Sequence, residues 1–222
     1  VDPSSNVIST IKDPDIIKIN DFLTENLARS IIQKHGEIDL ICANNVFAHI
    51  NNMHDVTNAI KLLLKDDGIF IFEVHYIGSL IEEVQYDMIY HEHIYYYSLI
   101  TLQKFFEKFD LEIFDIKPIP IHGGSMRYYV RNKGKLINKK TSLKIINLQK
   151  TEYHKGYDNS KTFLNYARMV NITRLNLMSL LKEIKNNNKS IIGYGASGRA
   201  NTLIQYCNIS NEILDYIVDD AP

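Results

Sequence analysis

Two apolar segments separated by an amphipathic stretch restrict the first part of the chain to an α/β fold. Residues 39–43 and 69–74 are apolar runs of strand length, and the turn sequence Asp66-Asp67-Gly68 introduces the second run. Residues 56–64, between the two runs, carry apolar side chains at helical spacing. A strand, a helix and a second strand in this order predict parallel strands joined by a right-handed crossover.

Further patterns extend this arrangement along the chain. A polar, turn-like segment at 132–140 marks a predicted boundary, and Gly156 with Asp158-Asn159-Ser160 divides a helical pattern over 145–186 into two pieces. The other predicted elements are a weak strand at 16–19, a helix at 27–33, a helix that Thr101 caps and that ends at 109, strands at 111–116 and 126–130, a strand at 190–192, a helix that ends at 204, and a strand at 213–218.

Composition and charge exclude several classes of protein. The 222 residues include 25 Lys and Arg against 26 Asp and Glu, and this balance argues against a protein that coats nucleic acid. No apolar run approaches the roughly 20 residues that a bilayer-spanning helix needs, so we expect no membrane protein. Cys42 and Cys207 lie far apart, which excludes a disulfide scaffold and a self-contained zinc module and fits a cytoplasmic protein. Because the chain opens at Val1 and stops at Pro222 directly after a predicted strand, we expect it to be a fragment of a longer protein.

The sequence Tyr90-His91-Glu92-His93 is the strongest candidate for a catalytic centre. It places two imidazoles that titrate near neutral pH beside a carboxylate and a phenol. These groups suit removal of a proton next to a carbonyl, in which an imidazole takes the proton and a phenol stabilises the enolate oxygen. The two histidines would diverge on a helix, so the spacing does not form a helical zinc site, and no metal site is predicted. A structural cluster of aromatic side chains and histidines is the alternative.

Three weaker candidates lie at the ends of predicted elements. His49 follows the carboxyl end of the strand at 39–43, where open α/β sheets bind ligands, and a surface or capping role is the alternative. Asp2 is placed to accept hydrogen bonds from ribose hydroxyls, or it simply forms a turn before a helix. The sequence His122-Gly123-Gly124-Ser125 offers backbone N–H groups to a phosphate or a sugar, and a hairpin turn is the alternative.

The sequence Gly193-Tyr194-Gly195-Ala196-Ser197-Gly198 matches the G-x-G-x-x-G pattern of dinucleotide-binding proteins. It follows a predicted strand and precedes a helix, and Asp219 ends the next strand about 20 residues later, as in the full pattern. Taken alone, the motif predicts an NAD-binding unit, of which only one strand–helix–strand turn lies within the chain.

Taken together, these motifs resemble those of the S-adenosylmethionine-dependent sugar C-methyltransferases, which act on nucleotide-linked 4-keto deoxysugars, for example at C-3. The resemblance extends over nearly the whole chain, and its most specific motifs are Y-H-E-H and H-G-G-S-x-R. It rests on residues 44–50, 72–74, 90–93, 121–127, 193–196 and 201–203.

The resemblance implies a three-part protein of which this chain is the interior. Residues 1–135 would form a class I methyltransferase Rossmann-like domain without its first strand and glycine-rich loop. Residues 136–222 would form a helical connection and the start of a second Rossmann-like domain. Zinc would be bound only in an amino-terminal domain that precedes these residues, and a tyrosine that the family contributes from that domain has no counterpart here.

The resemblance also assigns roles to residues. S-adenosylmethionine would contact Asp2, Asp21, Phe22 and Asn44. His93 is the expected base at C-3. Tyr90 would hydrogen-bond the C-4 oxygen, and His49 is the second candidate for that role. Glu92 would orient an imidazole, and His91 would be a structural neighbour. The nucleotide sugar, the one expected partner, would contact His122, Gly123, Gly124, Ser125, Arg127, Tyr194, Gly195, Ala196 and Asn201.

Two other functions remain open at this point. The first is an NAD-dependent oxidoreductase or epimerase that uses the loop at 193–198. The second is a fragment that binds a nucleotide sugar without turnover, since a chain without the glycine-rich loop would bind S-adenosylmethionine poorly.

Overall fold

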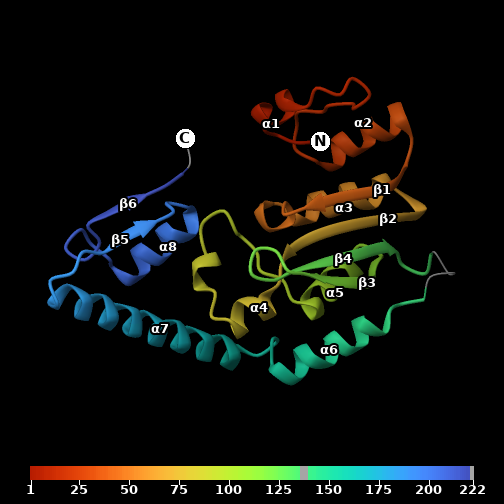
Figure 1. Cartoon of the computed structure of the whole chain (residues 1–222). Helices are drawn as coiled ribbons and strands as arrows, with labels where there is room; N and C mark the ends of the chain where they lie inside the picture. The colour runs from red at the N-terminus through yellow and green to blue at the C-terminus, as the bar shows by residue number, and fades with distance from the viewer. Residues whose placement is uncertain (136–139, 221–222) are drawn as a thin grey trace.

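A four-stranded mixed sheet forms the centre of the computed structural model, which describes residues 1–135 and 140–220. The strand order is β1 (Ile38–Asn44), β2 (Leu64–His75), β4 (Ser125–Asn132) and β3 (Leu111–Ile119). Strands β1 and β2 are parallel, whereas β2 pairs with β4 and β4 with β3 in antiparallel register. The predicted parallel pair is thus confirmed, and the later strands form a hairpin added beside it (Figure 1).

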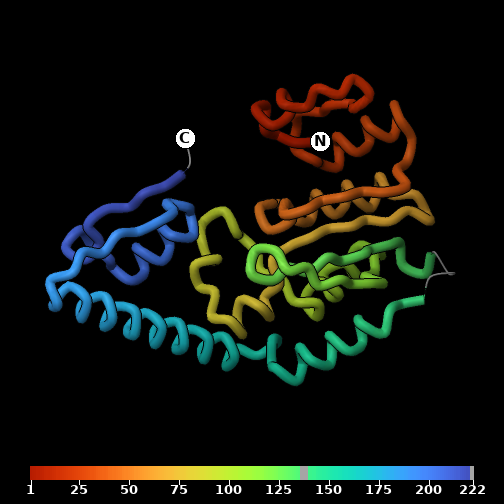
Figure 2. Tube along the Cα trace, in the orientation of Figure 1, coloured from red at the N-terminus to blue at the C-terminus, as the bar shows by residue number. Residues whose placement is uncertain are grey.

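Helices connect these strands and link them to a second, smaller sheet. Strands β5 (Ile192–Tyr194) and β6 (Tyr216–Val218) form that parallel pair. Figure 2 shows the chain running along two successive helices, α6 and α7, from the first sheet to the second. The helices and one-turn 3-10 helices (η) are α1 (Ser5–Thr10), α2 (Glu25–His35), η1 (Phe47–His49), α3 (Met53–Leu63), α4 (Ile77–Glu82), η2 (Tyr86–Met88), α5 (Leu99–Glu107), α6 (Leu143–Lys155), α7 (Ser160–Asn186) and α8 (Gly198–Cys207).

The main core lies on one face of the large sheet and is rich in aromatic side chains. Phe47, Phe70, Phe72 and Phe106 are fully buried, and the ring of Phe72 stacks on that of Tyr128. Such rings bury large apolar areas, so this cluster fixes η1 and α5 against β2 and β4. The alternation of buried and half-buried residues along β2 directs its other face away from this core.

A buried carboxylate joins α6 to the amino-terminal end of α5. Glu152 is fully buried, and it accepts hydrogen bonds from the backbone N–H groups of Leu99 (2.8 Å) and Ile100 (2.9 Å). The hydroxyl of Tyr76 donates a third bond at 2.9 Å. A negative group at this place satisfies helix N–H groups that have no partner within the helix.

The structure corrects three local predictions. Residues 16–19 form no strand, although the Asp2 N–H donates to the Ile19 carbonyl at 3.1 Å. Ser98 rather than Thr101 caps α5, and Thr101 is its partner in a capping box. Asp66-Asp67-Gly68 lies inside β2 at a register irregularity rather than in a turn, because the pairing of β2 with β1 begins earlier, at Leu64.

Most other elements lie where the periodicity placed them, with shifted ends. The long helical pattern is divided into α6 and α7, as predicted, and Gly156 ends α6 in a left-handed conformation. The predicted boundary at 132–140 falls partly outside the described residues. No helix among those described is long and apolar enough to span a membrane.

Candidate active site

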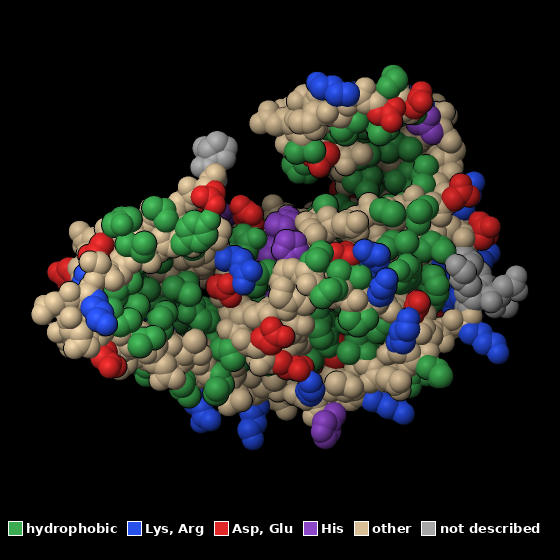
Figure 3. Space-filling model, viewed as in Figure 1, with side chains coloured by type: hydrophobic (Ala, Val, Ile, Leu, Met, Phe, Trp, Pro, Cys, Tyr) green, Lys and Arg blue, Asp and Glu red, His purple; other side chains and the backbone are tan. Residues whose placement is uncertain are grey.

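The predicted catalytic residues gather where β1 and β2 end. His49 ends η1 shortly after β1, while Tyr90 and His93 lie in the loop between η2 and α5. In Figure 3 a group of histidine side chains lines the hollow between the amino-terminal part and the unit that contains β5 and β6. The carboxyl ends of parallel strands are the usual ligand site of open α/β sheets.

Hydrogen bonds fix the ring of His93 in one orientation. Its Nδ1 lies 3.1 Å from the carbonyl oxygen of Met88, and its Nε2 lies 3.3 Å from the hydroxyl of Tyr90. A carbonyl oxygen only accepts, so Nδ1 carries the proton, and Nε2 presents a lone pair to the Tyr90 hydroxyl. This is the protonation pattern that a general base needs.

The surroundings keep this imidazole neutral near pH 7. Burial lowers the pKa of His93, and the ring of His49, with its centroid 5.0 Å away, lowers it further when charged. The hydrogen bond to the Met88 carbonyl and, to a lesser extent, the carboxylate of Glu92 oppose this by favouring the protonated ring. Burial also raises the pKa of Tyr90, so its phenol keeps its proton and acts as a donor.

His91 and Glu92 have no comparable anchoring. Both side chains are exposed, and among the ring contacts of the described residues His91 meets just the edge of Tyr90, at a centroid distance of 6.2 Å. Within the described residues, Glu92 makes no hydrogen bond to an imidazole. The group that orients His93 is the Met88 carbonyl, which sequence reasoning missed because every residue carries such a group.

Sequence reasoning also missed a buried histidine, His75, at the end of β2. Its Nε2 lies 2.8 Å from Oε1 of Gln85, whose amide nitrogen donates to the Gly123 carbonyl (2.7 Å) and to Glu83 (2.6 Å). These two acceptors fix the Gln85 amide, so His75 donates through Nε2. Its Nδ1 is buried and has no hydrogen-bond partner among the described residues, and burial lowers the pKa of the ring.

Most of the residues expected to bind the cofactor share one cavity with His49. Asp2, Asp21 and Phe22 line this cavity of about 930 Å³, together with apolar residues of β1 and α3. Carboxylates suit the hydroxyl and amino groups of an adenosine, and an apolar wall suits its base, so the residues present fit that part of S-adenosylmethionine. Asn44 ends β1, is exposed, and lies outside the lining of the cavity.

The loop His122–Ser125 and Arg127 are tied to protein groups. The loop is the connection between β3 and β4, where the Gly124 N–H (2.9 Å) and the Ser125 hydroxyl (3.3 Å) donate to the Ile121 carbonyl. Gly124 has φ +115°, and a Cβ there would lie 2.3 Å from the Ser79 hydroxyl, so no other residue fits. Arg127 places Nε (3.0 Å) and Nη2 (2.8 Å) on the buried carboxylate of Glu73.

The remaining predicted substrate residues belong to the unit of β5, α8 and β6. Tyr194 ends β5, its hydroxyl donates to Asp220, and the Ala196 N–H donates to Asp219. Gly195 makes the turn with φ +93°, and Asn201 lies in the first turn of α8. No described set of His, Cys, Asp or Glu side chains has the arrangement of a metal site.

Comparisons with known proteins agree with this arrangement. A family model described as a methyltransferase domain matches residues 1–116, and one described as a C-methyltransferase C-terminal domain matches residues 120–222. The chain is also 27% identical over 219 residues to C-methyltransferase NovU of Streptomyces niveus, covering 99% of this chain. It spans 52% of the length of that relative. The chain therefore belongs to the family of S-adenosylmethionine-dependent C-methyltransferases.

Proposed function

We propose that this chain is the catalytic part of an enzyme that methylates C-3 of a nucleotide-linked 4-keto deoxysugar. The observation that carries the proposal is the oriented pair of His93 and Tyr90, with a neutral imidazole and a protonated phenol 3.3 Å apart. A base beside an acid is what proton removal next to a ketone requires. In this proposal residues 1–135 carry the chemistry and residues 136–222 contribute to the sugar site.

The residues would divide the reaction as follows. Nε2 of His93 takes the C-3 proton as the C–H bond breaks, and the electron pair moves toward the C-4 oxygen. Tyr90 donates a hydrogen bond to that oxygen, and His49, whose ring centroid lies 5.0 Å from that of His93, is the second candidate donor. The resulting carbon nucleophile would take its methyl group from S-adenosylmethionine held by Asp2, Asp21 and Phe22, with the sulfonium C–S bond breaking to leave S-adenosylhomocysteine. The charge of Glu92 then stabilises the imidazolium, which returns its proton to water.

A pair of substrates tests the need for the ketone. We expect thymidine- or uridine-diphosphate-linked 4-keto-6-deoxyhexoses to be methylated at carbon and the 4-hydroxy sugars to give no product, because only the ketone acidifies the C-3 hydrogen. Product mass and the position of a ¹³C-labelled methyl group measure this. Equal methylation of both sugars, or a methyl group on oxygen, would contradict the proposal.

Replacing Asp2 by alanine tests the cofactor cavity. The carboxylate is expected to accept hydrogen bonds from a ligand, and losing bonds to a charged group costs about 1.5–3 kcal/mol, so S-adenosylhomocysteine should bind about 10- to 100-fold more weakly. Calorimetric titration measures the affinity. Asp13→Ala is the matched control, because Asp13 accepts from a backbone N–H two residues on, as Asp2 does, but lies outside the cavity. Equal losses in both variants would show that Asp2 acts through its turn.

The alternative of an NAD-dependent enzyme has less support. Asp219 places a carboxylate on the Ala196 N–H, in the loop where a pyrophosphate would need free donors. The alternative of a fragment that binds without turnover would be favoured if the nucleotide sugar bound but its C-3 hydrogen did not exchange with solvent.

A further inference from the structure

The carbonyl that orients His93 belongs to a segment with little support of its own. Met88 ends the one-turn helix η2, and a single 3-10 turn makes few and poorly aligned hydrogen bonds. No side chain caps η2 at Gln85. The position of the Met88 carbonyl oxygen therefore depends on the tertiary contacts of η2.

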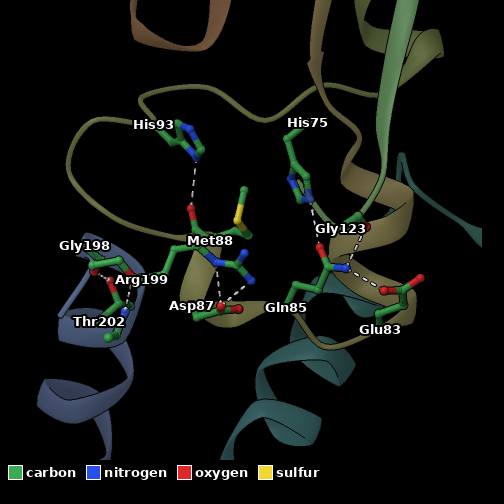
Figure 4. A network of polar contacts seen from close by, with 12 residues as sticks. His75, Glu83, Gln85, Asp87, Met88, His93, Gly123, Gly198, Arg199 and Thr202 are labelled. Carbon is green, nitrogen blue, oxygen red and sulfur yellow. Dashed lines mark hydrogen bonds and ion pairs between the residues drawn. The ribbon is translucent and has the colours of Figure 1, made fainter. Parts of the chain in front are cut away.

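Helix α8 contacts η2 near both of its ends. Near its start, Arg199 places Nε 2.8 Å and Nη2 2.5 Å from Oδ2 of Asp87 (Figure 4). Near its end, Cys207 Sγ lies 3.5 Å from the Tyr86 hydroxyl, and the ring of Tyr206 packs on that of Tyr86. Arg199 thus holds the residue that immediately precedes Met88.

Strand β2 and the β3–β4 hairpin hold the other side of η2. Gln85 accepts from His75 and donates to the Gly123 carbonyl, as Figure 4 shows. With Gln85 fixed on one side and Asp87 on the other, the Met88 carbonyl points at Nδ1 of His93. The same oxygen accepts a 3.1 Å hydrogen bond from the Tyr96 hydroxyl.

The glycine-rich motif at 193–198 precedes the helix that carries Arg199, so it helps to place Arg199 against Asp87. Its Ala196 N–H is engaged by Asp219, and the turn at Gly195 leads into α8, whose first residues are Gly198 and Arg199. The motif thus leads into α8, and the second residue of this helix, Arg199, contacts Asp87 of η2, which lies 112 positions earlier in the sequence.

We propose that Arg199 is a positioning residue for the base. Its ion pair with Asp87 holds η2 so that the Met88 carbonyl keeps the proton of His93 on Nδ1 and leaves Nε2 available. The catalytic meaning of this link rests on the proposed function, whereas the link between Arg199 and the His93 ring does not.

Nitrogen-15 NMR of the histidine rings in the full, ligand-free chain tests the link directly. The wild type should show His93 protonated on Nδ1. Arg199→Ala and Asp87→Asn should each give a mixture of the two tautomers, because a displaced Met88 carbonyl no longer holds the proton on Nδ1. Arg199→Lys should lie between them and the wild type, since an ammonium cannot reproduce the two-nitrogen contact.

Lys185→Ala is the matched control. It breaks a partly exposed ion pair between Lys185 on α7 and Asp215, just before β6, without touching η2, so His93 should keep the wild-type tautomer. An unchanged His93 ring in Arg199→Ala, or an equal change in Lys185→Ala, would overturn the proposal. Circular dichroism of each variant checks that it is folded.

Kinetics then separate the two proposals. Arg199→Ala should lower kcat about tenfold with KM within about twofold, as expected of a misplaced catalytic group rather than a lost binding contact. A tautomer change in a protein whose wild type does not methylate the ketone would refute the proposed function and leave the link intact. An unchanged His93 tautomer in Arg199→Ala, together with a wild type that methylates the ketone, would refute the link and leave the proposed function intact.

Discussion

His93→Asn is expected to lower kcat at least about 100-fold, since general base catalysis contributes about 10²- to 10⁴-fold. Asparagine can still donate to the Met88 carbonyl, which His93 reaches at 3.1 Å, so the loop should keep its conformation. The variant lacks the lone pair at Nε2 that, in the proposed mechanism, would receive the C-3 proton. Exchange of the C-3 hydrogen for deuterium from solvent should fall to the same extent.

The pH profile gives a second signature of this residue. Burial lowers the pKa of His93, so the folded protein holds the ring neutral to a lower pH than free histidine does. Activity should therefore persist below pH 6.5, the ordinary value, and decline only as the pH falls through the lowered pKa. That decline should be absent from the residual activity of His93→Asn.

His154→Asn provides the control, because His154 is exposed on α6, away from the base. It should retain wild-type exchange and turnover. If deuterium exchange in His93→Asn proceeded at the wild-type rate, another group would have to be the base.

Glu152→Ala is expected to reduce the free energy of unfolding by about 3–5 kcal/mol. The variant leaves the N–H groups of Leu99 and Ile100 and the hydroxyl of Tyr76 buried without their acceptor, and each unsatisfied group costs about 1–3 kcal/mol. These costs do not add fully, because water can enter the space that the side chain vacates. A loss of this size is a large part of a typical domain's stability.

Urea unfolding followed by circular dichroism measures this loss. Glu152→Gln should lose less free energy of unfolding than Glu152→Ala, because the amide of glutamine keeps one oxygen that can still accept hydrogen bonds from these donors. Glu212→Ala serves as the control, since Glu212 is exposed and its carboxylate has no hydrogen bond within the described residues. A loss below 1 kcal/mol for Glu152→Ala would mean that the three donors find other partners.

Local patterns in the sequence predicted most of the fold. The apolar run at 39–43 and the helical spacing at 56–64 correspond to β1 and α3, because side-chain periodicity reports directly on which face of an element is buried. The sequence predicts the cap of α5 at Thr101, whereas the structure has it at Ser98, because both residues favour caps and the sequence alone does not show where the helix begins.

The candidate site likewise contains residues that the sequence indicates and groups that only the fold brings into the site. Tyr90 and His93 are recognisable as candidates from the sequence because a phenol and an imidazole, which can donate and accept protons, lie three residues apart. The Met88 carbonyl was not recognisable, because a backbone group has no sequence signal. His75 follows the apolar run at 69–74 with no motif around it, and only the fold places Gln85 2.8 Å from its ring.

By itself, the sequence therefore determined the α/β class, the family and the side chains able to move a proton. The tertiary structure alone decided which nitrogen of His93 carries the proton, and which helix the G-x-G-x-x-G motif precedes. The physical reason is that a hydrogen bond depends on where two atoms lie. Arg199 and Asp87, which are 112 positions apart, meet only when the β5–α8 turn has carried one helix onto η2.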